Sequence, residues 1–165
     1  MSDHEILTLS SGEVFVYDDI DAVRGDIFAY EDFESTLVEL EGWGGRVVEV
    51  RSMNGREKAM YIKAIVGDDA QADARKIDFA AINPALMIAT CYNPAKRPNG
   101  EYVSGVSQHK LFRSGDESLI NDKSAAVLEK IANVARLLSG MGDDGESSEI
   151  KLVKNLTPGQ PKPGE

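Results

Sequence analysis

Two short β-favouring runs on either side of a glycine-rich tetrapeptide constrain the fold of this chain more than any other feature. The runs are Ser35 to Leu40 and Arg46 to Arg51, and between them lies Gly42-Trp43-Gly44-Gly45. Glycine adopts positive φ without a Cβ penalty, so this spacing predicts a β-hairpin over residues 35–51. Trp43 stands at the hairpin tip. Two interpretations of it stay open: packing against the core, or presentation to a partner.

A helix is predicted directly after the hairpin. Asn54 is a suitable N-cap, and Glu57 follows it three residues later, which is the pattern of a capping box. Apolar residues then recur at helical spacing until Gly67. The sequence therefore predicts a helix over about 54–66.

The middle of the chain is less regular. An alanine-rich segment predicts a second helix over 70–82, ending at Asn83-Pro84. For the apolar run from Leu86 to Tyr92, periodicity alone does not separate helix from strand. Residues 93–110 carry three turn signals within eight residues, which predict a loop or an irregular hairpin.

Two further helices are expected before the C-terminal tail. Ser114-Gly115-Asp116-Glu117 resembles a capping box that opens a short helix over 115–120. A longer helix is predicted over 123–139, with Gly140 as its left-handed cap. One face of that helix carries a stripe of apolar residues: Val127, Ile131, Val134 and Leu138. The stripe favours core packing, and together with Trp43 it is also the candidate partner-binding surface.

Both ends of the chain differ from its centre in composition. Residues 1–34 are acidic and contain short apolar groups, which predicts short strands or weak order. Residues 142–165 are rich in Gly, Pro and Ser and predict a flexible tail. The expected fold is therefore α+β: an N-terminal β-hairpin region, a mainly helical domain that completes residues 35–141, and a disordered C-terminal tail.

Charge and cysteine content exclude several classes of protein. The 165 residues contain 18 Lys and Arg against 28 Asp and Glu, a formal charge of −10. Such a chain is repelled by nucleic acid and by anionic membranes, and no apolar segment reaches the length of a membrane span. The single cysteine, Cys91, lies in an apolar run and predicts a buried thiol. We therefore expect an intracellular protein.

Catalytic and cofactor motifs are not found in the sequence. His4 and His109 are far apart and lack metal-ligand spacing, and Cys91 has no neighbouring His or second Cys. Acidic clusters lack the Gly and Glu positions of a calcium loop, and no phosphate-binding, dinucleotide-binding or nucleophile-elbow pattern occurs. We expect no catalytic residue, no cofactor and no metal site, and a protein that works by binding other proteins.

Two blocks of the chain combine several specific motifs. The first block runs from Gly42-Trp43-Gly44-Gly45 through Val47–Arg51 to Met53–Glu57. The second block comprises Leu111-Phe112, Asp116-Glu117, Leu119, Lys123–Leu128 and Ala135–Gly140. In order and spacing, over roughly 36–66 and 110–141, the blocks resemble the family of tail assembly chaperones of long-tailed, siphovirus-type bacteriophages, whose usual Glu-Arg order appears here as Arg56-Glu57. The chain departs from it by an insertion over 93–110 and by a loose match in the first thirty residues.

The resemblance implies a function in virion assembly. Chaperones of this family act in the host cytoplasm and are absent from the mature virion. They bind the tape measure protein, keep it soluble and recruit tail tube subunits. Self-association is a further expected interaction, and the tail would suit the linker to a longer, frameshifted product.

Two alternatives from other classes remain. One is a structural tail-completion or head–tail joining protein of the virion. The other is a small phage-encoded enzyme or nucleic-acid-binding module, against which the acidic charge and the missing motifs argue.

Overall fold

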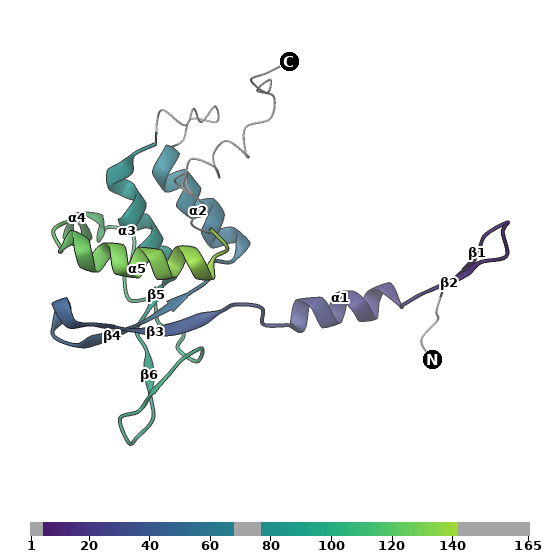
Figure 1. Cartoon of the computed structure of the whole chain (residues 1–165), viewed down its shortest axis with the longest axis horizontal. Coiled ribbons are helices and arrows are strands. Elements are labelled where there is room, and N and C mark those ends of the chain that lie inside the picture. The colour runs from purple at the N-terminus through teal and green to yellow at the C-terminus, as the bar shows by residue number, and fades with distance from the viewer. Residues whose placement is uncertain (1–4, 68–76, 142–165) are drawn as a thin grey trace, which may run out of the picture. The chain divides into compact units, whose positions relative to one another are not determined.

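A computed structural model of the chain (Figure 1) describes residues 5–67 and 77–141. These residues form two compact units, divided between Asp32 and Phe33. We call them unit 1 and unit 2. The fold is α+β, as predicted, and the predicted tail over 142–165 lies outside the described residues.

Unit 1 contains a β-hairpin and a helix. Strands β1 (Glu5–Thr8) and β2 (Val14–Tyr17) pair antiparallel, and α1 (Ile20–Ala29) follows them. Asp19 caps α1, because its carboxylate accepts a hydrogen bond from the backbone N–H of Ala22 at 2.8 Å. We expected short strands or weak order here, so the strands agree with the prediction and the helix was missed. None of the residues with described side chains in unit 1 is buried.

Unit 2 is built on the predicted hairpin. Strands β3 (Ser35–Leu40) and β4 (Arg46–Arg51) pair antiparallel along their whole length, which confirms the hairpin over 35–51. The connection is a short 3-10 turn, η1 (Glu41–Trp43), followed by Gly44 and Gly45 at φ 70° and 72°. Only glycine adopts these angles without steric cost, which explains the two glycines after Trp43.

Helix α2 (Gly55–Val66) begins with the predicted capping box. The Asn54 side chain accepts a hydrogen bond from the N–H of Glu57, and the Glu57 carboxylate accepts one from the N–H of Asn54, both at 2.9 Å. Gly67, at φ 76°, ends the helix. The helix therefore starts and stops where its local sequence predicts.

Helix α3 (Phe79–Thr90) corrects the prediction of a helix over 70–82. Residues 68–76 lie outside the described part of the chain, and the helix continues through Pro84 instead of ending there. Proline lacks the N–H that would bond to the carbonyl four residues earlier, that of Ala80. The side-chain amide of Asn121 donates to this carbonyl at 3.1 Å. A residue distant in sequence thus satisfies the group that the proline leaves open.

The apolar run from Leu86 to Tyr92 is partly helix and partly strand. Its first five residues complete α3, and its last two form β5 (Cys91–Tyr92), which pairs with β4 and extends the sheet to the order β3-β4-β5. Residues 93–110 then form the irregular hairpin that was one of the two expectations. Its strands are β6 (Ala95–Lys96) and β7 (Tyr102–Val103).

Two helices complete unit 2. Helix α4 (Glu117–Asn121) is short, and its predicted capping box is wrong: its N-cap is Asp116, which makes no side-chain bond to the helix N-terminus. The Asp116 carboxylate instead accepts from the N–H of Arg113, because the preceding turn folds back on itself. Helix α5 (Ala125–Leu138) lies within the predicted 123–139, and Gly140 has the expected left-handed conformation.

The core of unit 2 lies between the sheet and the helices. Figure 1 shows α2, α3, α4 and α5 on one side of the β3-β4-β5 sheet, with β6 on the other. Fully buried side chains from both layers fill the space between them: Leu40, Val48, Val50, Tyr61, Ile65, Leu86, Met87 and Ile131. No helix in the described residues is both long enough and apolar enough to cross a membrane.

Candidate functional site

A groove of about 540 Å³ opens beside the β3–β4 turn. We call it the Trp43 groove. Strand β4, the segment between the 93–110 insertion and α4, and helix α4 supply its walls. The lining is mostly apolar: Trp43, Val47, Val48, Leu111, Phe112, Leu119 and Ile120. Arg46, Asp116 and Lys123 add charge of both signs. A groove of this composition accepts apolar side chains and fixes their orientation by a few polar contacts.

Trp43 packs against unit 2, which is one of the two interpretations that the sequence left open, and its presentation to a partner stays a prediction. Its ring is half-buried and meets the ring of Phe112 edge-on, with the centroids 6.5 Å apart and the planes at 75°. This is a favourable geometry for an aromatic pair. Trp43 thus packs against unit 2 with part of its surface and lines the groove with the rest.

The hairpin tip lies against α5. A Cβ added to Gly42 would lie 2.6 Å from the Cγ2 of Val127, so glycine is required by the closeness of the helix rather than by a positive φ. One turn further along, the Lys130 ammonium donates to the carbonyl of Glu39 at 2.8 Å. These two contacts hold the turn that carries Trp43.

One side of the groove exposes leucine side chains to solvent. Leu119 is 64% exposed although its neighbour Ile120 is buried, and Leu111 is 38% exposed. Folding of unit 2 does not require Leu119 to be apolar, because it has little contact with the core. It is the part of the groove most available to a partner.

The predicted stripe on α5 is oriented mainly toward the core. Ile131 is fully buried, so core packing accounts for it. Val127, Val134 and Leu138 are half-buried and pack against the core cluster. Of the five candidate residues, Trp43 lines the groove and the four residues of the α5 stripe do not. Val127 lies against Gly42, the residue before Trp43.

Sequence reasoning missed Leu111, Phe112 and Leu119 as site residues. All three belong to the second block of the family resemblance, but nothing in that block predicted which of its residues stay exposed. The available signal was the apolar Leu119 beside Ile120 in a helix of five residues, which is too short to bury both.

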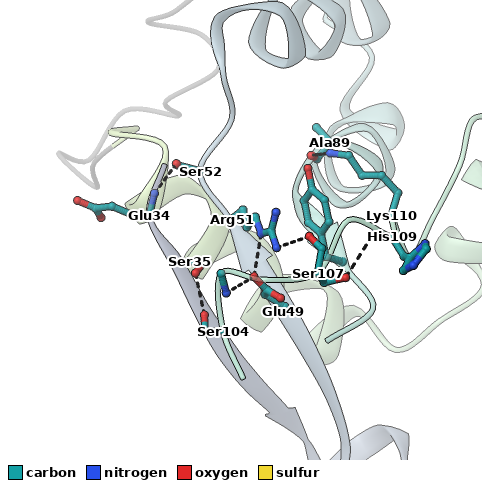
Figure 2. Close-up of polar contacts among 12 residues, drawn as sticks. Glu34, Ser35, Glu49, Arg51, Ser52, Ala89, Ser104, Ser107, His109 and Lys110 are labelled. Carbon is teal, nitrogen blue, oxygen red and sulfur yellow. Dashed lines mark hydrogen bonds and ion pairs between the residues drawn. The ribbon is translucent and has the colours of Figure 1, made fainter. Parts of the chain in front are cut away.

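A buried polar network lies on the other side of the sheet from α5 (Figure 2). The carboxylate of Glu49, which is fully buried, accepts hydrogen bonds at 2.7 Å from the Arg51 Nε and from the N–H of Gly105. Arg51 also donates through Nη2 to the carbonyl of Ser107 at 2.5 Å, and its guanidinium lies 4.1 Å from the centre of the Tyr92 ring. The network binds the 93–110 insertion to β4.

Two further contacts fasten the same insertion. The Lys110 ammonium donates to the carbonyl of Ala89 (Figure 2). It also donates to the Glu57 carboxylate at 2.7 Å. The hydroxyls of Ser35 and Ser104 are 2.7 Å apart. Glu49, Arg51 and Lys110 all have charged partners, so the arrangement suits positioning of the insertion rather than proton transfer.

Cys91 and His109 are the cysteine and the histidine of the described residues. Burial raises the pKa of the Cys91 thiol from 9.0 to about 12, with smaller opposing effects from a hydrogen bond with Thr90 and from Lys110. A thiol with such a pKa is inert as a nucleophile at neutral pH. His109 is exposed, His4 lies outside the described residues, and no three potential metal ligands cluster in the part of the chain that the structure describes.

Comparison with known proteins gives a weak likeness in fold. No family model matches the chain, and no curated protein matches it. Among solved structures, the tail assembly chaperone of bacteriophage HK97 is similar at a TM-score of 0.43 and 12% identity, over 77% of this chain and 100% of that one. A likeness of this degree leaves the function to be argued from the residues of the chain itself.

Proposed function

We propose that this chain is a non-enzymatic phage tail assembly chaperone. It binds the tape measure protein, keeps that protein soluble and helps recruit tail tube subunits. It acts in the host cytoplasm and is not retained in the mature virion. The observation that carries the proposal is the convergence of the two family-like sequence blocks on the Trp43 groove.

The two blocks are far apart in sequence and adjacent in space. Trp43 belongs to the first block, Phe112 belongs to the second, and their rings are in contact. Leu111 and Leu119, also from the second block, line the same groove. Apolar residues that serve only folding would be expected in the core, whereas Leu119 is mostly exposed. An exposed apolar surface of this kind is typical of a binding site.

The chemistry of the groove suits one face of an amphipathic helix. Such a helix presents apolar side chains at i, i+3 or i+4, and i+7, which enter an apolar groove, while flanking charges set its register. Trp43, Leu111 and Leu119 provide the apolar surface, and Arg46, Asp116 and Lys123 provide the charges. The formal charge of −10 would keep a complex with an aggregation-prone helical protein in solution.

The test is co-expression with the tape measure protein of the same phage. The wild-type chain is expected to move that protein into the soluble fraction. Leu119→Glu should reduce the soluble amount at least about fivefold, because a charge in an apolar interface costs more than 1 kcal/mol. Leu137→Glu is the matched control, since Leu137 is 67% exposed on α5 and outside the groove.

Two results would contradict the proposal. An equally insoluble tape measure protein with and without the chain would remove its basis. Mass spectrometry of purified virions addresses the alternative of a structural component: a tail-completion or joining protein would be found in the particles, and a chaperone would not.

A further inference from the structure

The hairpin of unit 1 is apolar on both of its faces. Ile6 lies opposite Val16 on one face, and Leu7 lies opposite Phe15 on the other. Their exposed fractions are 65%, 62%, 43% and 47%, so neither face is covered. A hairpin with one face in water normally alternates apolar and polar residues. Apolar residues on both faces are typical of strands inside a larger sheet that is covered on both sides.

Unit 1 by itself does not supply that larger sheet. Within the described residues, β1 and β2 pair only with each other, which leaves each strand one edge without a ladder. An isolated two-stranded hairpin is at best marginally stable in water. Free edges and uncovered apolar faces together are the features by which one protein adds strands to the sheet of another.

The charge of unit 1 restricts which kind of partner can cover its hairpin. Residues 1–32 contain nine Asp or Glu and one Arg, a formal charge of −8 out of the −10 of the whole chain. Three of these carboxylates are exposed: Asp18 directly after β2, and Asp21 and Asp26 on α1. Two copies of unit 1 would repel each other, whereas a basic surface would attract this one.

We propose that unit 1 is a docking arm whose hairpin adds to a β-sheet edge of a basic partner protein, with both apolar faces covered in the complex. The arm is separate from the Trp43 groove, so one chain can hold a helical client and a β-sheet partner together. The inference rests on the proposed function in its choice of partner, the tail tube subunit, because a protein that recruits this subunit to a client needs a second surface.

Binding of the full-length chain to the purified tail tube subunit of the same phage tests the inference. Ile6→Thr/Val16→Thr alters one face of the hairpin and Leu7→Thr/Phe15→Thr alters the other, while threonine retains β-propensity. Each double variant should weaken binding at least about tenfold, the effect of losing 1.4 kcal/mol. Met60→Gln/Leu137→Gln, which changes two residues of unit 2 that are each 67% exposed, is the control and should bind as the wild type does.

A charge variant keeps the test independent of hairpin folding. Asp18→Asn/Asp26→Asn leaves both strands unchanged. It should weaken binding, and it should make the binding affinity less dependent on salt between about 50 and 300 mM, a range in which screening becomes strong. Wild-type affinity in either hairpin variant would overturn the inference. A fall in the thermal midpoint of the hairpin variants would also overturn the inference, because the hairpin would then pack against its own chain. A fall in their oligomer size would overturn it too, because the hairpin would then pack against a second copy.

The outcome separates this inference from the proposed function. If the wild-type chain solubilises the tape measure protein but does not bind the tube subunit, the docking arm is wrong and the chaperone proposal stands. If it does not solubilise the tape measure protein, the chaperone proposal fails whatever the arm binds.

Discussion

At the scale of single residues, Gly42 decides how closely the hairpin tip approaches α5. The turn that carries Trp43 is held by this contact, since no side chain larger than hydrogen fits between the backbone of residue 42 and Val127. Well-packed interiors respond to one added methyl group by strain, because neighbouring atoms relax only partly.

Gly42→Ala should therefore destabilise unit 2 by about 1–3 kcal/mol in chemical denaturation. Gly55→Ala is the control: the added Cβ meets no atom within 4 Å, and the change should be within about 1 kcal/mol of neutral. Combining Gly42→Ala with Val127→Ala should recover part of the loss. If the double variant instead loses the sum of the unfolding free energies that the two single variants lose, the contact between residue 42 and Val127 is not the cause.

Cys91 gives a pH-dependent prediction at the same scale. In the folded chain its pKa is about 12, against an ordinary 9.0, so below pH 9 both the folded and unfolded states hold the proton and the thiol has no effect on the pH dependence. Between pH 9 and 12 only the unfolded state releases it. The free energy of unfolding should fall there by up to about 1.4 kcal/mol per pH unit because of this group.

Urea unfolding of the wild type and of Cys91→Ala at pH 8, 9.5 and 10.5 measures the effect. The wild type should lose stability more steeply than the variant above pH 9. Parallel pH profiles would mean that the thiol is not buried. A thiol reagent at pH 8 should react with Cys91 only as fast as the protein opens.

At the scale of elements, β4 connects the two sides of the sheet. Its residues alternate between the helix-covered core and the polar network, so Val48 and Val50 face the core while Glu49 and Arg51 face the 93–110 insertion. Burial of an ion pair is costly, and each partner receives one hydrogen bond from the insertion: the N–H of Gly105 donates to Glu49 Oε1, and the carbonyl of Ser107 accepts from Arg51. The second carboxylate oxygen of Glu49, Oε2, is buried without a hydrogen-bond partner among the described residues.

Glu49→Ala should release the insertion and destabilise unit 2 by about 3–5 kcal/mol, because Arg51 would remain buried without its carboxylate. Limited proteolysis by trypsin measures the release, since Lys96 is exposed in the insertion and is followed by Arg97, whereas the Arg97–Pro98 bond resists trypsin. Cleavage there should accelerate at least about tenfold. Glu101→Gln removes only the exposed pair with Arg97 and should leave the rate unchanged.

At the scale of the whole molecule, stability and charge are separated along the chain. Every buried apolar residue among those described lies at Val38 or later, whereas unit 1 contributes none. Unit 1 instead holds −8 of the formal charge of −10. Unit 2 therefore provides the folded framework, and unit 1 carries most of the net negative charge.

Removal of residues 1–32 should leave the thermal midpoint of unit 2 within about 4 °C of the full-length value, because no core contact is lost. The formal charge would fall to −2, and solubility at pH 7 should fall with it. Calorimetry and precipitation with ammonium sulfate measure the two quantities. A large fall in thermal midpoint would show that unit 1 packs on unit 2.

What the sequence by itself determined are the features set by neighbouring residues. The hairpin over 35–51, the capping box of Asn54 and Glu57, and the left-handed Gly140 at the end of α5 each depend on backbone geometry within a few residues. Local patterns therefore predict them correctly. The prediction of a buried thiol at Cys91 succeeded for a related reason, since its apolar neighbours imply burial in either a helix or a strand.

Only the tertiary structure decided the features that join distant residues. Helix α3 passes through Pro84 because Asn121 satisfies the carbonyl of Ala80, and no local rule contains that partner. Strand β5 exists because β4 offers it an edge. The sequence analysis named Trp43 as a candidate but predicted no groove beside it. The other wall of the groove, formed by Leu111, Phe112 and Leu119, comes from a segment about seventy residues later. Such contacts depend on how the elements pack, which periodicity and capping do not encode.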